Sequence, residues 1–218
     1  MKKETRYVVF DLDGTLLDTL SDLRACVNAS LTKFGLPERS AEQIKASLGN
    51  GSEHLIRTSM PGHEEQAAAV LAYYRTIYPP KEGAKTAPYP GIPELIEKLA
   101  ESGWRAAILS NKPHGAVLSL RDTFFPGIPF AAGDRDGVPR KPDPTALFQL
   151  MRDMGADPKK TIYVGDSEVD VQLARNASLP CAAVAWGYRG AEQLREAGAK
   201  VIAGDAEELF EVLEHGVL

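Results

Sequence analysis

Two aspartates one residue apart, Asp11 and Asp13, follow the short apolar run Tyr7–Phe10. The β-branched and aromatic residues of this run predict a buried strand, and Gly14 ends it. Because alternate residues of an extended chain point to the same side, both carboxylates should leave the strand together. Two like charges placed side by side are unfavourable unless a cation, a shared proton or a substrate interacts with them. The Asp-x-Asp-Gly pattern alone is equally compatible with an ordinary turn.

Further polar residues stand where other predicted strands end or where a helix begins. They are Ser110 and Asn111 after the strand 106–109, Asp166 after the strand 161–164, and Lys141 before the helix entrance Pro142-Asp143-Pro144. Taken singly, each of them suits an ordinary turn, a surface lysine or a helix cap. In an open parallel sheet, however, ligands bind beyond the carboxyl ends of the strands, so these residues should share a crevice with the two aspartates. Several carboxylates without cysteine or histidine suit a hard cation, Mg²⁺ first.

The predicted elements fall into two groups. Apolar spacing predicts helices over 20–34 and 67–77, with shorter helices over 40–60 joined by Gly49-Asn50-Gly51, and a linker over 81–90. Farther along, predicted strands at 106–109, 129–132, 161–164 and 181–185 alternate with helices, and weaker signals fill 201–213. This alternation predicts an α/β fold, a Rossmann-like parallel sheet with helices on both faces. We expect a core of residues 1–17 and 87–218, into which an α-helical cap of residues 18–86 is inserted.

Composition excludes several classes of protein. The chain has 218 residues, of which 44% are hydrophobic and 25% are charged, and its net charge is −5. Without a basic stripe, this charge argues against nucleic-acid binding. The apolar runs are far shorter than the roughly 20 residues that span a membrane, and the N-terminus has no secretion-signal pattern. With only two cysteines, Cys26 and Cys181, the sequence predicts a cytoplasmic protein whose thiols are structural.

Taken in order, the polar segments resemble the motifs of one enzyme family. The motifs are Asp11-Leu-Asp-Gly-Thr-Leu-Leu-Asp18 (DxDGTLxD), Ser110 at a strand end, Lys141-Pro142, and Gly165-Asp-Ser-Glu-Val-Asp170 (GDSxxD). In this order and approximate spacing they resemble the haloacid dehalogenase superfamily of phosphohydrolases. The resemblance covers nearly the whole chain.

The resemblance implies a role for each of these residues in phosphoryl transfer. Asp11 would attack phosphorus and become an aspartyl-phosphate, and Asp13 would serve as general acid and then general base. Ser110 would bind a phosphoryl oxygen, and Lys141 would offset the negative charge around it. These four are the expected catalytic residues.

The same resemblance implies a bound Mg²⁺. Its expected ligands are the Asp11 side chain, the Asp13 backbone carbonyl and the Asp166 side chain. Asp170 would contact the metal directly or only through its bound water, and the sequence favours the second arrangement, four residues beyond Asp166 on a helix.

Further stretches resemble one branch of the family, the phosphoglycolate phosphatases. They are Asp18–Leu23, Gly49-Asn50-Gly51, Tyr89–Gly91, Ser110–Pro113 and Ala185–Arg189. This narrower resemblance implies a small phosphorylated metabolite as substrate, 2-phosphoglycolate first. The expected substrate contacts are Ser110, Asn111, Lys141, Gly51 and Arg57, the last two on the carboxylated leaving group. An Arg57 that faces water on its helix is the ordinary alternative.

Other functions remain open at this point. Sister activities are an inorganic pyrophosphatase, a sugar-phosphate phosphatase or a phosphosugar mutase, although a mutase usually carries a histidine soon after the first motif and none lies between Asp18 and Phe34. A signalling module phosphorylated on aspartate is more remote, because it would be shorter and lack a helical cap. A monomer and a homodimer are both compatible with the sequence.

Overall fold

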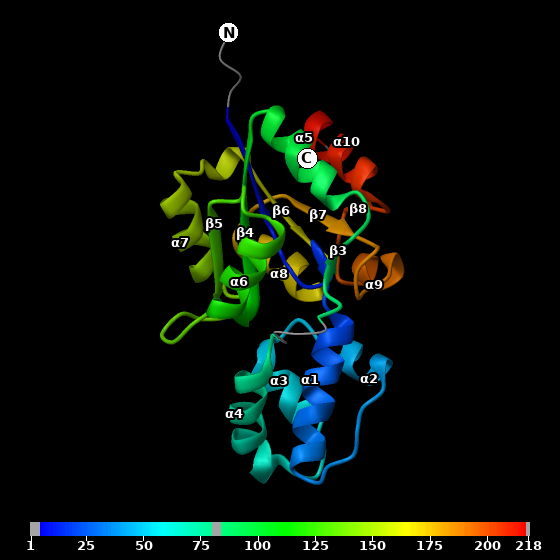
Figure 1. Ribbon diagram of the computed structural model, residues 1–218. Coiled ribbons are helices and arrows are strands. Elements are labelled where there is room, and N and C mark those ends of the chain that lie inside the picture. Colours follow the sequence, from blue (N-terminus) through cyan, green and yellow to red (C-terminus); the bar gives the residue numbers. More distant parts are fainter. Residues whose placement is uncertain (1–4, 80–83, 217–218) are drawn as a thin grey trace.

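The computed structural model of the chain (Figure 1) describes residues 5–79 and 84–216. A six-stranded sheet runs through it in the order β5-β4-β1-β6-β7-β8, and every neighbouring pair of strands is parallel. The strands are β1 (Arg6–Phe10), β4 (Trp104–Pro113), β5 (Phe130–Asp134), β6 (Thr161–Gly165), β7 (Cys181–Val184) and β8 (Val201–Ala203). β1 is thus a central strand: β4 and β5 lie on one side of it, and β6, β7 and β8 lie on the other. The predicted α/β fold is confirmed.

Helices cover both faces of this sheet. They are α5 (Ile92–Glu101), α6 (His114–Phe124), α7 (Thr145–Met154), α8 (Glu168–Asn176), α9 (Ala191–Glu196) and α10 (Ala206–His215), with a short 3₁₀ turn, η2, at Pro158–Lys160. The pleat of β1 explains the two layers, because its alternate side chains point to opposite faces. Val8 and Phe10 pack with α5 and α10, whereas Tyr7 and Val9 pack with α7 and α8.

A separate group of helices lies at one end of the sheet (Figure 1). It contains α1 (Leu20–Lys33), α2 (Ala41–Ala46), α3 (Gly51–Thr58), the 3₁₀ turn η1 (Glu64–Gln66) and α4 (Ala67–Ile77). We call residues 20–78 the helical lobe and the rest of the described chain the sheet lobe. The helical lobe has a hydrophobic cluster of its own, in which Leu31, Ile56 and Val70 are buried. No described helix has the length and apolar character that crossing a membrane requires.

The two lobes are joined by paired segments that the sequence did not predict. Strands β2 (Leu17–Asp18) and β3 (Ala87–Pro88) form a small antiparallel sheet. Nearby, the buried carboxylate of Asp22 accepts hydrogen bonds from the backbone amides of Lys85 and Thr86. Two-residue strands are too short to carry a periodic signal. The linker expected over 81–90 lies partly outside the described residues, and its described part includes β3.

Strand β4 is longer than predicted, and this changes the setting of the site. The sequence predicts its end at Leu109, but the strand continues to Pro113 with a shift of register against β5 after Leu109. Ser110 and Asn111 therefore lie in the irregular end of a strand and not in a loop. Nothing in the sequence breaks the strand before Pro113, which has no amide hydrogen to donate.

Candidate active site

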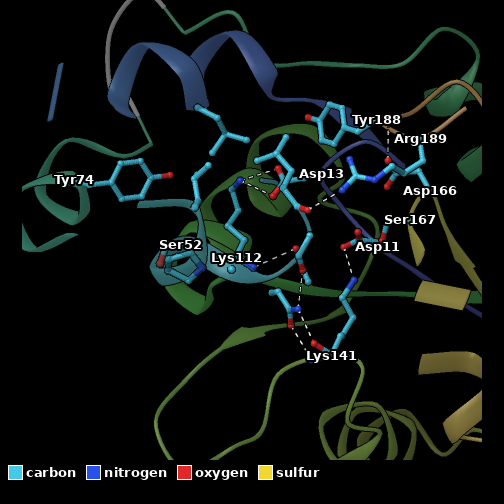
Figure 2. A pocket seen from close by; sticks show the side chains of 18 residues that line it. Asp11, Asp13, Ser52, Tyr74, Lys112, Lys141, Asp166, Ser167, Tyr188 and Arg189 are labelled. Atoms are coloured by element: carbon cyan, nitrogen blue, oxygen red, sulfur yellow. Dashed lines mark hydrogen bonds and ion pairs between the residues drawn. The ribbon is translucent and has the colours of Figure 1, made fainter. Parts of the chain in front are cut away.

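Three polar residues converge at the carboxyl end of the sheet. Asp11 follows β1, Asp166 follows β6, and Ser110 stands near the end of β4. The amide of Asp11 still donates to the carbonyl of Val164 at 2.8 Å, so its backbone is held in line with the sheet. One pocket (Figure 2) collects most of the predicted residues, namely Asp11, Asp13, Gly51, Ser110, Asn111, Lys141 and Asp166.

The chain turns sharply after Asp11, and at this turn the carboxylate of Asp166 leaves no room for a side chain. Gly14 has a φ of +85°, and a Cβ at this position would collide with the Asp166 carboxylate. Gly187 approaches the same carboxylate just as closely. Two glycines from distant parts of the chain thus allow the backbone to enclose one carboxylate.

Lys141 links two of the carboxylates. Its Nζ lies 2.9 Å from Oδ1 of Asp11 and 2.8 Å from Oδ1 of Asp170, and it donates to the Tyr163 hydroxyl at 3.1 Å. The side chains of Lys141 and Asp170 are almost fully buried, at 3% and 0% exposure. A buried charge with this many partners is held in one position, which suits a group that must neutralise charge at a fixed point.

Burial dominates the ionisation of the cluster. It raises the pKa of Asp11 to about 7, an effect that Lys141 opposes and Asp170 reinforces. Burial also raises the pKa of Asp166 well above its usual range, with Asp170 and Asp11 adding to the effect. For Lys141, burial lowers the pKa, but Asp11 and Asp170 outweigh it and the net shift is upward. The lysine is therefore charged at neutral pH, while the carboxylates need more positive charge than it supplies.

The residues present fit a divalent cation. Asp11, Asp166 and Asp170 are buried, and each offers one oxygen within 4.8 Å of the others. Three buried carboxylates beside a single ammonium leave an excess of negative charge that a hard cation would balance. Oxygen is also the ligand atom that Mg²⁺ prefers.

Asp170 differs from Asp166 in how its oxygens are used. Oδ1 of Asp170 accepts from Lys141 and from Tyr163, and Oδ2 accepts from the amide and hydroxyl of Ser167. Because both oxygens already have two donors each, Asp170 is better placed to hold Lys141 than to bind a metal directly.

Asp13 leaves the same turn and accepts hydrogen bonds from two residues of the sheet lobe, one on each side of the helical lobe in the sequence. Its Oδ1 accepts from the hydroxyl of Thr19 at 2.6 Å, and both its oxygens lie 2.7 Å from Nζ of Lys112. Unlike Asp11 it is only half-buried. The predicted pair of aspartates therefore has two environments, one enclosed by the sheet and one facing the helical lobe.

Asn111, an expected substrate contact, has a structural task. Its Nδ2 donates to the carbonyls of Gly49 and Lys141, and its Oδ1 accepts from the amide of Lys141. The amide side chain thereby fixes the backbone that carries the buried lysine and touches the helical lobe. Its polar atoms have no further capacity for strong contacts with a phosphate.

Arg57 does not reach the pocket. Its side chain is 55% exposed and lies 3.5 Å from Glu53, one turn earlier on α3. The pocket-facing side of α3 instead carries Gly51, Ser52 and Leu55. The proposed contact between Arg57 and substrate is not supported, because the phase of the helix turns this residue toward water.

Several pocket residues were not singled out from the sequence, namely Ser52, Lys112, Ser167, Tyr188 and Arg189. Arg189 spans the lobes, donating to the carbonyls of Lys45 and Leu48 and pairing with Glu168 at 2.9 Å. Lys112 and Arg189 stand inside stretches that resemble the phosphatase branch, and this was the available signal. Without the fold, their types alone would suit a solvated surface.

Comparison with known proteins places the chain in a family. Residues 8–184 match the family model described as haloacid dehalogenase-like hydrolase. The chain belongs to the haloacid dehalogenase-like hydrolases. The sequence-based assignment to this superfamily is thus confirmed, and the protein is an enzyme of the hydrolase class.

Similar proteins carry consistent names. Phosphoglycolate phosphatase 1 of Pseudomonas aeruginosa is 34% identical over 214 residues, covering 94% of this chain and 78% of its own. The phosphoglycolate phosphatase of Pseudomonas savastanoi pv. phaseolicola is 33% identical, with 95% of this chain and 79% of its own covered. A crystal structure from Lactobacillus delbrueckii subsp. bulgaricus, named "putative phosphoglycolate phosphatase", is 32% identical with a TM-score of 0.89, over 95% of this chain and 98% of that one.

Proposed function

We propose that this hydrolase is a Mg²⁺-dependent phosphatase that converts 2-phosphoglycolate to glycolate and phosphate through an aspartyl-phosphate on Asp11. The observation that carries the proposal is the buried Asp11 at the carboxyl end of the central strand, paired at 2.9 Å with Lys141. The names of the similar proteins support the choice of substrate.

The reaction would proceed in two transfers. A carboxylate oxygen of Asp11 attacks phosphorus, the bond to the leaving oxygen breaks, and Asp13 gives that oxygen a proton. Water then attacks the phosphorus of the aspartyl-phosphate while Asp13 takes its proton, which releases phosphate and restores both aspartates. Ser110 would donate to a phosphoryl oxygen, and Lys141 would balance charge on Asp11 and on the phosphoryl group.

The metal would be held by the side chains of Asp11 and Asp166 and by the backbone carbonyl of Asp13. Asp170 would act through Lys141, as its saturated oxygens favour. When bound, Mg²⁺ would neutralise negative charge on the phosphoryl oxygens.

We propose further that residues 18–86 form a cap that decides the substrate, inserted into a core of residues 1–17 and 87–218. In the described residues the helical lobe contributes Leu23, Gly49, Ser52 and Tyr74 to the pocket. The cavity is small, about 50 Å³, and this favours a small leaving group over a protein or a large sugar. Cytoplasmic location and a monomeric or homodimeric state stay predictions.

Mg²⁺-dependent phosphate release tests the proposal. We would compare kcat/KM for 2-phosphoglycolate, pyrophosphate and several sugar phosphates. A preference for 2-phosphoglycolate of about 100-fold or more supports the assignment, since a hydrogen bond to a charged group contributes up to about this factor. Comparable rates on all substrates would contradict the narrow assignment and leave a general phosphatase. A preference for pyrophosphate or a sugar phosphate would favour that sister activity.

A further inference from the structure

Three basic side chains line the pocket, and they differ in how many hydrogen-bond and ion-pair partners they have. Lys141 is held by Asp11 and Asp170, and Arg189 by Glu168 and two backbone carbonyls of the helical lobe. Lys112 has one carboxylate partner among the described residues, Asp13. Of the three, Lys112 is therefore the cation with the most capacity for a second anion.

The ammonium of Lys112 is enclosed but incompletely used. Its side chain is 2% exposed, and its Nζ lies 4.6 Å from the centre of the Tyr78 ring. Nζ forms hydrogen bonds to the two oxygens of Asp13, while a lysine ammonium has three N–H donors. Among the described residues, no acceptor takes the third N–H of Lys112, so this donor remains for a ligand. A buried ammonium favours anionic ligands over neutral ones, because burying a charge without an opposite charge beside it is unfavourable.

Ser52 offers a second donor in the same pocket (Figure 2). The residue is 5% exposed, and its hydroxyl has no hydrogen-bond partner among the described residues. Most buried hydroxyls in native proteins are paired, so an unpaired one lining a pocket indicates a missing ligand or water. The Ser52 hydroxyl is uncharged and has no existing partner among the described residues, so an anion can accept its hydrogen bond without displacing another group.

The start of α3 adds a favourable field. Ser52 is the second residue of this eight-residue helix, and the preceding Asn50 makes no side-chain cap to its first turn. Free amides and the helix dipole at such an end favour an anion. A Cβ on Gly51 would come within 3.2 Å of the carbonyl oxygen of Asn111, which shows that the helix start is packed against the residue next to Lys112.

We propose that Lys112 and Ser52 together bind the carboxylate of the leaving group and so select a phosphorylated hydroxy acid. The inference rests on the proposed phosphatase function and replaces the role that the sequence gave to Arg57. The third donor of Lys112 and the Ser52 hydroxyl bind the carboxylate, while Asp13 keeps its place on the ammonium. Leu48 and Leu55, which also line the pocket, exclude water and strengthen both contacts.

The test compares two substrates that differ in the carboxylate. Ethyl phosphate has a methyl group where 2-phosphoglycolate has its carboxylate. The two esters differ in intrinsic reactivity as well, but this difference is the same for every variant, so a change in the ratio of their kcat/KM values reports carboxylate recognition. We would measure this ratio for the wild type, for Ser52→Ala and for Lys112→Met. Ser59→Ala is the matched control, because Ser59 is a buried serine next to the end of α3 that does not line the pocket and whose hydroxyl already donates to the Leu55 carbonyl.

We expect the ratio to fall about 10-fold in Ser52→Ala and about 30-fold or more in Lys112→Met, as for lost hydrogen bonds to charged groups. Ser59→Ala should keep the wild-type ratio. Lys112→Met will also slow ethyl phosphate, since it frees Asp13, but a merely structural effect would slow both substrates equally. If Lys112→Met does not fold, Ser52→Ala decides the matter.

The outcomes separate this proposal from the proposed function. A wild-type preference for 2-phosphoglycolate that persists in both variants overturns the Lys112–Ser52 subsite and leaves the phosphatase assignment intact. A wild-type enzyme that hydrolyses both esters equally well overturns the assignment to 2-phosphoglycolate, and with it the carboxylate subsite.

Discussion

The two sides of the pocket are built differently. On the phosphoryl side, Lys141, Asp170 and Tyr163 hold one another in a buried network with hydrogen bonds on every polar atom. On the leaving-group side, among the described residues, the Ser52 hydroxyl has no hydrogen-bond partner and the Lys112 ammonium has one carboxylate partner. The first arrangement fixes reacting groups before a substrate arrives, which lowers the cost of reorganisation during the reaction. The second leaves donors for the substrate to satisfy, which is how a site discriminates.

Removing the nucleophile should have the largest effect. Asp11→Asn is nearly isosteric but cannot form the aspartyl-phosphate, so we expect phosphate release to fall about 10⁴-fold or more with the fold retained. Circular dichroism would verify the fold. Asp143→Asn, at an exposed helix entrance, is the matched control. Turnover within tenfold of wild type would remove Asp11 as nucleophile.

Asp166→Asn tests the metal on the same side. Loss of one charged ligand should raise the Mg²⁺ concentration for half-maximal activity about 10- to 100-fold. A titration of activity with Mg²⁺ measures this shift. An unchanged metal dependence would argue that Asp166 binds only Thr15 and Tyr188, as it does in the described structure.

The phosphoryl side could be predicted from the sequence and the leaving-group side could not. Asp11, Ser110 and Asp166 follow strands, and the end of a parallel strand fixes the edge at which a residue appears. Arg57 depends on the phase of a short helix, where a rotation of 100° separates a pocket from water. Lys112 lies past the predicted end of its strand, so neither its burial nor its partner could be inferred from local pattern.

Acidity offers a way to examine the phosphoryl side without substrate. Since the pKa of Asp11 is raised from 3.8 to about 7, the folded, metal-free protein binds a proton that the unfolded chain has lost at intermediate pH. Stability should therefore fall as pH rises from about 4 to about 7. Relative to Asp11→Asn, the wild type should lose up to about 4 kcal/mol over this range.

Urea unfolding in the presence of a chelator, at several pH values, measures this difference. Added Mg²⁺ should remove it, because the cation favours the ionised carboxylate. Parallel pH profiles for the wild type and Asp11→Asn would contradict a raised pKa at this position.

Arg57→Ala should have the smallest effect. Because the side chain is exposed and its one ion pair within the described residues is with Glu53, we expect kcat/KM for 2-phosphoglycolate to stay within about twofold of wild type. A tenfold rise in KM would instead restore Arg57 as a substrate contact and require the helical lobe to close further than described.

Tyr188 and Arg189, neighbours on one loop, couple the Asp166 carboxylate to the position of the helical lobe. The amide of Tyr188 donates to Asp166 at 2.7 Å, and the next residue grips the carbonyls of Lys45 and Leu48 in the helical lobe. A movement of this loop would therefore change the contacts with Asp166 and the contacts with the helical lobe together. By thermodynamic linkage, a ligand that binds more tightly with the lobes together must itself hold them together, and by the same free energy. Release of the product and loss of the Tyr188 hydrogen bond to Asp166 would then accompany the same separation of the lobes.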